Sequence, residues 1–299
     1  GFLLGGAPRP RETARGGCLR RRAIRPPPPY WIATLCWIAL GAGLGYGWIQ
    51  ITPAHVLQSL GFVPHLSPSF PGRVWPVLVP GWTLNYEMFF YAVFALTLLV
   101  TARYRLMALS AIFLAVLVLG TALPRDQAWL VTYGSPLVLE FLGGCFIAEF
   151  WLRGGVRGGL FPVLLLLAGW LAVVLFGVPV DANDHWARVT GFGLPALLIT
   201  LGAVGLNQGL PRLRFLERLG DASYAIYLFH LFFVQPLAGI WVRLPSLHGP
   251  GMALAFISLC LVSSAWLGLF LHRHLEGNLK RAFGGLFQTD MRGVRFARR

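Results

Sequence analysis

Long apolar runs are the feature that most constrains what this chain can fold into. A helix needs ~20 apolar residues to cross the hydrocarbon core of a bilayer. Eight segments have that length and character, namely 30–50, 82–102, 106–123, 133–152, 159–178, 189–207, 222–242 and 252–271. They leave no stretch large enough for a separate soluble domain. The sequence therefore predicts an all-α, polytopic helical membrane protein with about eight transmembrane helices.

The charged residues are few and lie mostly on one side of the predicted membrane. They make up 12% of the chain, against roughly 25% in ordinary soluble domains. With the N-terminus placed inside, only four of the 25 lysines and arginines fall in external loops, namely Arg73, Arg125, Arg188 and Arg243. Cytoplasmic loops retain basic residues, so both termini are predicted to be cytoplasmic in a bacterial inner membrane. The net charge of +14 follows from this orientation, and no nucleic acid partner is expected.

The two ends of the chain differ from its apolar middle. Residues 1–29 are rich in Gly, Pro and Arg and end in four prolines, which predicts a disordered leader. Because the chain starts with Gly1, either its natural beginning lies upstream or the leader is an altered reading of a former helix. The predicted transmembrane domain covers 30–271, and a basic cytoplasmic tail covers 272–299.

The cysteines and the longest external connection carry weaker signals. The four cysteines show neither a CxxC pair nor a histidine at metal-ligand spacing, so neither a disulfide framework nor a metal site is expected. The connection 51–81 is rich in proline and aromatic residues, which favours a folded cap over the membrane face. Since no Asp or Glu accompanies His55 and His65 in this connection, we interpret both as ordinary loop residues.

Ionisable residues inside apolar spans are the best guide to chemistry, because they are unfavourable in hydrocarbon and usually face a cavity or another helix. The candidates are Glu87, Glu140, Glu149 and His230. Glu149 precedes Arg153 by four residues, a spacing that predicts a structural ion pair at the membrane interface.

Glu87 belongs to the string GWTLNYEMFFY, residues 81–91. On a helix, Thr83 and Tyr91 share its face, so a carboxylate and two hydroxyls form a polar stripe in an apolar span. Two interpretations stay open. The carboxylate is functional, or it is an interhelical hydrogen-bond clamp.

Two further strings carry polar side chains. In GDASYAIYLFH, residues 220–230, the spacing of Ser223, Tyr227 and His230 predicts one polar helix face. An imidazole is suited to proton transfer near pH 7, although a lone helical histidine is also a common packing residue. Glu140 is placed by its spacing beside Gly143 and Gly144, where a neighbouring helix or a ligand could approach closely, and burial could keep it protonated.

These same strings carry a family resemblance. PGWTLNYEMFFYAVF resembles the Trp-Ser/Thr-Leu…Glu…Phe-Tyr segment of the acyltransferase type 3 family of integral-membrane O-acyltransferases, in particular the succinoglycan-type exopolysaccharide acyltransferases of bacteria. YGSPLVLEFLGGCFIAE and LGDASYAIYLFHLFFVQPL are similar to later family segments, and CLRRRAIR…PPYWIATL is similar to a basic inner loop and the helix after it. The likeness covers roughly residues 18–275.

The resemblance implies transfer of an acyl group, usually acetyl, from cytoplasmic acyl-CoA to a hydroxyl of a glycan or lipid-linked sugar. Acyl-CoA is then a co-substrate, and no tightly bound cofactor is expected. The resemblance places Glu87 and His230 around the reaction path as catalytic residues. The other residues that it implies are Arg21, Arg22 and Arg25 at the CoA phosphates and Trp82, Thr83, Tyr91, Glu140, Ser223 and Tyr227 along the substrate path.

The resemblance also leaves alternatives open. The first family helix, which carries an arginine and a histidine about three turns later, has no counterpart here, so the chain is also interpreted as a truncated, inactive relic. A transporter or flippase of a glycan or small solute would use the same intramembrane carboxylates as ion sites. Flux without consumption of acyl-CoA distinguishes the transporter.

Overall fold

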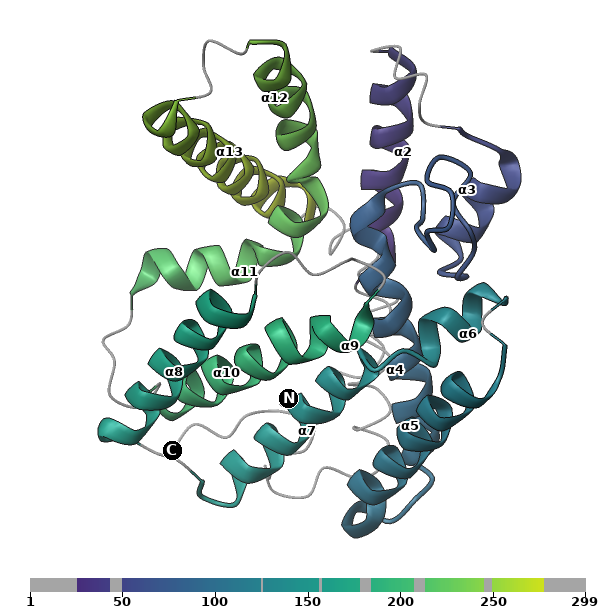
Figure 1. Ribbon diagram of the computed structural model, residues 1–299, viewed down its shortest axis with the longest axis vertical. Coiled ribbons are helices and arrows are strands. Elements are labelled where there is room, and N and C mark those ends of the chain that lie inside the picture. Colours follow the sequence, from purple (N-terminus) through teal and green to yellow (C-terminus); the bar gives the residue numbers. More distant parts are fainter. Residues whose placement is uncertain are drawn as a thin grey trace, which may run out of the picture. The chain divides into compact units, whose positions relative to one another are not determined.

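A computed structural model describes residues 26–43, 50–124, 126–155, 158–177, 184–206, 213–244 and 249–276. Within these ranges the chain forms helices, turns and loops and contains no β-strand. The helices are α2 (Pro27–Gly43), α3 (Pro53–Leu60), η2 (Val79–Gly81), α4 (Trp82–Thr97), η3 (Ala102–Tyr104), α5 (Arg105–Ala122), α6 (Ala128–Tyr133), α7 (Val138–Leu152), α8 (Leu160–Phe176), α9 (His185–Arg188), η4 (Val189–Gly193), α10 (Leu194–Leu206), α11 (Arg214–Phe229), α12 (Leu231–Arg243), α13 (Pro250–Leu271) and η6 (His272–Glu276) (Figure 1).

Four helical segments in the described residues are long and apolar enough to cross a membrane, and their bounds are Ala102–Ala122, Ala128–Leu152, His185–Leu206 and Gly251–His274. A fifth would be the pair α11 and α12, which are bent by 55° at their junction. The all-α membrane class is thus supported, whereas the count of eight spans is not. The runs expected at 30–50, 82–102 and 159–178 form α2, α4 and α8, which have only 17, 16 and 17 residues.

The chain divides into two compact units. Unit 1 contains the described residues between Thr83 and Pro211, from α4 to α10, and unit 2 contains those of 21–82 and 212–299.

Helices α8 and α10 of unit 1 approach one another through glycines. A Cβ on Gly169 of α8 would lie 2.8 Å from the carbonyl oxygen of Pro195, and one on Gly202 of α10 would lie 2.6 Å from that of Pro162. Small residues let backbones approach closely in a membrane, where helices gain little from burying apolar side chains against each other. Close backbone contact therefore holds α8 and α10 together.

The end of α5 packs in the same way against the residues that precede α7. Any Cβ added at Gly120 would meet the backbone of Gly134. Aromatic rings of α4 complete this packing: Phe89 stacks on Tyr133 with 4.3 Å between ring centroids, and Phe90 stacks on Phe141 at 5.3 Å. Helices α4, α6 and α7 thus share one aromatic core.

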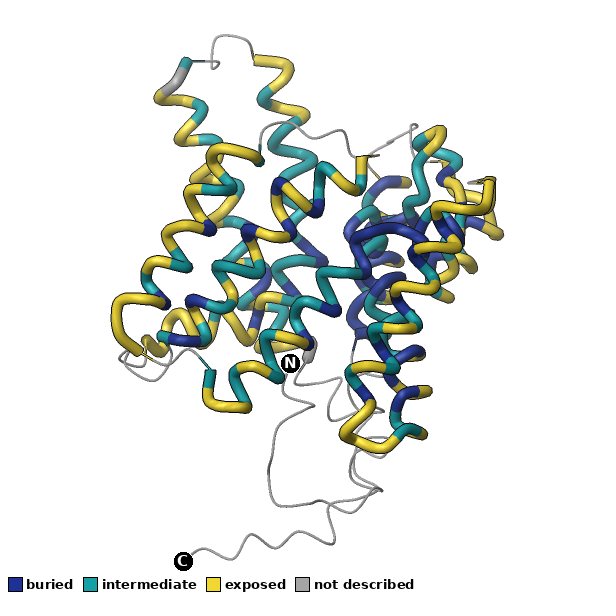
Figure 2. Tube along the Cα trace, turned by 60° about the horizontal axis from the view of Figure 1, so that its bottom comes forward, coloured by how far each residue is buried: buried dark blue, intermediate teal, exposed yellow. Residues whose placement is uncertain are grey.

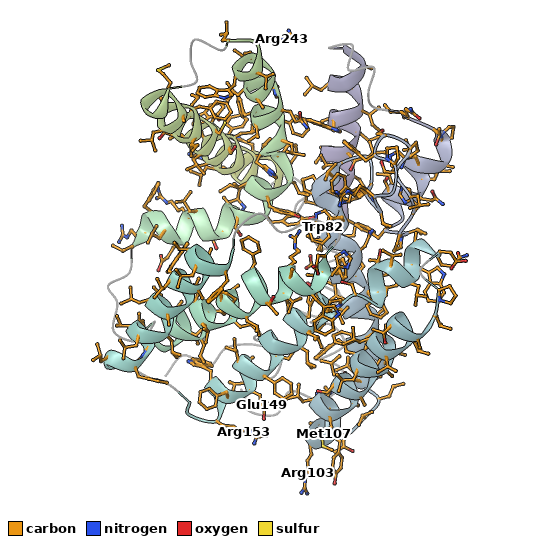
Figure 3. The ribbon with its side chains drawn as sticks, viewed as in Figure 1. Trp82, Arg103, Met107, Glu149, Arg153 and Arg243 are labelled. Atoms are coloured by element: carbon orange, nitrogen blue, oxygen red, sulfur yellow. The ribbon has the colours of Figure 1, made fainter. Side chains whose placement is uncertain are left out.

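Basic side chains lie at the end of unit 1 where α7 ends. Glu149 Oε1 accepts a 2.7 Å hydrogen bond from Nε of Arg153, which confirms the predicted i,i+4 pair. Figure 3 shows this pair at the end of α7, at the same end of the unit as Arg103. Arg105 is buried nearby in sequence and donates to the carbonyl oxygens of Thr97 and Val100.

Outward-facing apolar side chains are common on the long helices. Exposed and less exposed residues recur along them (Figure 2). Leu164, Leu167 and Leu171 of α8 are each more than half exposed, as are Leu254 and Leu261 of α13. Such continuous apolar exposure is the pattern expected of a lipid-facing surface.

In unit 2, α2 begins among the prolines that the sequence placed in a disordered leader. Pro27 to Pro29 form its first turn, because the first backbone N–H groups of a helix have no intrahelical acceptor and proline removes nothing there. Tyr224 of α11 donates a 2.7 Å hydrogen bond to the carbonyl oxygen of Pro26. This contact ties the start of α2 to α11.

The expected cap at 51–81 is folded and fastened by hydrogen bonds. Ser59, at the end of α3, is buried and accepts a 3.0 Å hydrogen bond from the backbone of Val77 through its hydroxyl. Its carbonyl oxygen accepts from the hydroxyl of Tyr30 of α2 at 3.2 Å, and the indole of Trp31 donates to the carbonyl oxygen of Leu60 at 2.9 Å. The connection therefore packs on α2.

His55 and His65 are not ordinary loop residues, because both are buried and hydrogen bonded to each other. His65 Nδ1 donates to the carbonyl oxygen of Val63 at 2.7 Å, which leaves Nε2 of a neutral ring as an acceptor. His55 Nδ1 lies 2.6 Å from that Nε2 and donates to it. The sequence suggested no role because a histidine usually pairs with a carboxylate, and here its partner is another histidine.

We expect Gly202→Ala to destabilise the protein by about 1–3 kcal/mol, since the new methyl group would overlap the backbone of Pro162 and Leu166. Melting of the purified protein in detergent measures this. Gly144→Ala in α7 is the matched control, because a Cβ there would meet nothing within 4 Å. Equal melting temperatures in the two variants would contradict close α8–α10 packing.

The histidine pair should make stability depend on pH. Burial, reinforced by His65, lowers the pKa of His55 to about 4, against about 6.5 in an unfolded chain. Folding therefore favours the neutral ring, and its contribution is full above pH 6.5 and is lost as the pH falls from 6.5 towards 4. We expect the melting temperature to fall by several degrees more across this window in the wild type than in His55→Gln. His274→Gln, at an exposed histidine, should keep the wild-type pH profile.

Candidate functional site

Glu87 of α4 forms the first candidate site, in unit 1. Its Oε1 accepts a 2.6 Å hydrogen bond from the hydroxyl of Tyr91, one turn later, and both side chains are half-buried. The predicted polar stripe is thus present at Tyr91. Thr83 lies one turn earlier on the same helix and is also half-buried.

Glu140 of α7 lies in a notch made by a glycine. A Cβ added at Gly193 would be 2.6 Å from Glu140 Oε1, so a side chain at that position would displace the carboxylate. Gly193 ends the π-helical turn η4, and Gly143 meets the side chain of Leu197 of α10. The predicted close approach of a neighbouring helix is therefore confirmed at Gly143, whereas a Cβ at Gly144 would meet nothing within 4 Å.

Four more polar side chains of unit 1 are linked to Glu140 or to one another. Tyr86 of α4 is buried and hydrogen bonded to the side chain of Ser135, which is also buried. Arg188 of α9 interacts electrostatically with both Glu140 and Tyr86, and Tyr133 interacts with Tyr86. We call Tyr86, Tyr133, Ser135, Glu140 and Arg188 the α4–α7–α9 cluster.

Sequence reasoning missed most of this cluster. It placed Arg188 in an external loop, and the structure shows that Arg188 is helical, in α9 at the start of the candidate span His185–Leu206. The usable signal was local: Asp184 caps the helix by accepting from the backbone of Ala187 at 2.9 Å. An N-cap residue there predicts a helix that starts before Arg188.

His230 forms the second candidate site, in unit 2, at the junction of α11 and α12. Its Nδ1 lies 2.7 Å from the carbonyl oxygen of Tyr227. A carbonyl only accepts, so Nδ1 carries the proton and Nε2 of the neutral ring is the acceptor. The hydroxyl of Tyr227 donates to the carbonyl oxygen of Pro80 at 2.8 Å, just before Trp82.

The predicted polar face of α11 is only partly present. Tyr227 and His230 are half-buried neighbours with 6.1 Å between their ring centroids, but Ser223 is exposed. The expected single helix 222–242 is also wrong, since α11 starts at Arg214 and the helix bends at His230. His230 therefore lies at a helix break.

The remaining predicted site residues form no further cluster among the described residues. Arg21, Arg22 and Arg25, expected at the CoA phosphates, lie outside the described residues. Within the described ranges, no group of three or more His, Cys, Asp or Glu side chains could hold a metal ion. Trp82 is half-buried at the start of α4 and belongs to unit 2.

Comparison with known proteins identifies the family. The acyltransferase domain family matches residues 1–271. The chain is 38% identical over 268 residues to the exopolysaccharide production protein ExoZ of Rhizobium meliloti (strain 1021), across 87% of this chain and 80% of that protein. No solved structure matches significantly. The family match covers most of the chain and both candidate sites, and this chain therefore belongs to the acyltransferase domain family.

Proposed function

We propose that the chain is a membrane O-acyltransferase that moves an acetyl group from acetyl-CoA to a hydroxyl of an exopolysaccharide sugar. The observation that carries this proposal is the family membership together with the similarity to an exopolysaccharide production protein. Ionisable side chains that lie on apolar helices support it, because such residues mark functional paths in membrane proteins.

The reaction moves one proton in two steps and exchanges one C–S bond for one C–O bond. The acceptor hydroxyl oxygen attacks the thioester carbonyl carbon, a C–O bond forms, and the C–S bond breaks. The hydroxyl proton passes to a general base and then to the departing CoA sulfur. A positioned general base typically accelerates such a step by about 10²–10⁴-fold.

His230 is the proposed general base. Its Nδ1–H donates to the carbonyl oxygen of Tyr227, which fixes the tautomer and directs the lone pair to Nε2. The position at the bend between α11 and α12 supports this role, since broken helices in membranes occur where they are buried in protein or line a water-filled cavity.

Glu87 is the proposed second catalytic residue. Tyr91 donates to its Oε1 and holds the carboxylate in one orientation. We propose that Oε2 accepts a hydrogen bond from a reacting hydroxyl. Thr83, Tyr91, Tyr227 and Trp82 are proposed to line the substrate path, whereas exposure of Ser223 gives that residue less support.

His230→Gln and Glu87→Gln should each lower kcat by at least 100-fold in an acyl-transfer assay with radiolabelled acetyl-CoA and a de-O-acylated exopolysaccharide. Both changes keep the side chain polar, so the melting temperature should stay within a few degrees of the wild type. Glu149→Gln, which removes only the exposed pair with Arg153, should retain activity. Loss of folded protein in Glu87→Gln would instead support a structural clamp.

The donor is proposed to bind at the cytoplasmic face through Arg21, Arg22 and Arg25. Arginine forks suit phosphate oxygens, and each charge-assisted contact contributes roughly 1.5–3 kcal/mol. Replacing all three by Ala should weaken CoA binding by orders of magnitude, as measured by calorimetric titration of the purified protein, and wild-type binding should weaken with added salt. Equal CoA affinity in the triple variant would contradict this donor site.

A further inference from the structure

We propose that the α4–α7–α9 cluster binds hydroxyl groups of the acceptor sugar. This inference rests on the proposed function and adds an acceptor site to it. Four of the five members have no counterpart among the residues predicted from sequence, and Glu140 was expected only somewhere along the substrate path.

The cluster is an unfavourable arrangement for a purely apolar bundle. Glu140 lies inside the candidate span Ala128–Leu152, where charged groups are rare unless they serve a pathway or a ligand, and Arg188 lies near the start of the candidate span His185–Leu206. Tyr86 and Ser135 are only 5% and 2% exposed. Three separate stretches of the chain thus contribute polar groups to a region that apolar packing would otherwise fill.

The backbone is shaped to hold the carboxylate of this cluster. Directly after Arg188, the helix adopts the π-helical turn Val189–Gly193. Such turns are rare overall, and those that occur are often found at functional sites. Gly193 provides the space occupied by Glu140 Oε1, and a Cβ at Gly191 would lie 2.8 Å from the carbonyl oxygen of Phe176 of α8. Both glycines let the turn form against its neighbours.

The charge of the cluster selects the class of ligand. The cluster contains one carboxyl group and one guanidinium, so it lacks the several cations that the phosphates of CoA would require. A carboxylate accepts hydrogen bonds, a guanidinium donates them, and phenol and serine hydroxyls do both. A sugar carries many hydroxyls that both donate and accept, and the two tyrosine rings add apolar faces beside the polar groups.

The position in unit 1 agrees with acceptor binding. Glu140 lies in the first turn of α7, and Arg153 follows the last turn, which separates them by roughly 20 Å along a helix that rises ~1.5 Å per residue. The basic end with Arg103 and Arg153 suits an anionic donor (Figure 3). Glu140, and with it the α4–α7–α9 cluster, lies at the opposite end of α7.

The test compares acceptor and donor kinetics in folded variants. Arg188→Gln removes the guanidinium fork, and Tyr86→Phe removes one buried hydroxyl while it conserves the ring. We expect the KM for a de-O-acylated succinoglycan oligosaccharide to rise at least tenfold in Arg188→Gln and about three- to tenfold in Tyr86→Phe. The KM for acetyl-CoA should stay within twofold of the wild type. Glu149→Gln is the control at the other end of α7.

Direct binding of the same oligosaccharide to purified protein separates this inference from the proposed reaction. If the wild type binds it in an Arg188-dependent manner but transfers no acetyl group, the reaction is refuted and the site is supported. Unchanged acceptor affinity in both variants overturns the site, as does a rise in the KM for acetyl-CoA alone. Absence of oligosaccharide binding by a folded wild type also overturns it. If Arg188→Gln fails to fold, Tyr86→Phe alone decides between these outcomes.

Discussion

The absence of a hydrophobic driving force between helices in lipid is the constraint on which the structure of unit 1 depends. Apolar side chains gain little by leaving lipid for another helix, so association relies on close backbone contact and polar links. Gly120, Gly134, Gly169 and Gly202 provide such contact between α5, α6, α8 and α10. At Gly193 the space left by the absence of a side chain is filled by the carboxylate of Glu140 and not by a backbone. Glycines therefore serve both the packing of the helices and the placement of a candidate functional side chain.

The cap of unit 2 follows a different rule, because its irregular backbone must find partners outside regular helices. Tyr30 and Trp31 of α2 provide two donors to carbonyl oxygens at the end of α3. The two histidines continue this pattern with a chain of donors that ends on the carbonyl oxygen of Val63. Neutral imidazoles suit such a buried chain, since each ring donates once and accepts once.

Sequence reasoning was most accurate where a pattern is local. The expected runs 106–123 and 252–271 agree closely with α5 and α13, and the links from Glu149 to Arg153 and from Tyr91 to Glu87 follow from four-residue spacing. It failed at features that depend on partners distant in sequence or on breaks in a helix. Apolar composition continues through His230, so hydropathy gives no sign of the bend there, and α4 ends at Thr97, sooner than the apolar run 82–102 that contains it.

Glu87 and Glu140 show why composition alone could not rank candidate sites. Both lie on apolar helices, and the family resemblance favoured Glu87. Glu87 has a partner on its own helix, Tyr91, so its immediate setting is visible in the sequence. Glu140 lies against Gly193 of another helix, and Arg188 and Tyr86 from further segments interact with it electrostatically. A carboxylate whose surroundings are assembled from several elements can be oriented by the fold as a whole, and such preorganisation favours recognition of a hydroxyl-rich ligand over simple clamping of two helices.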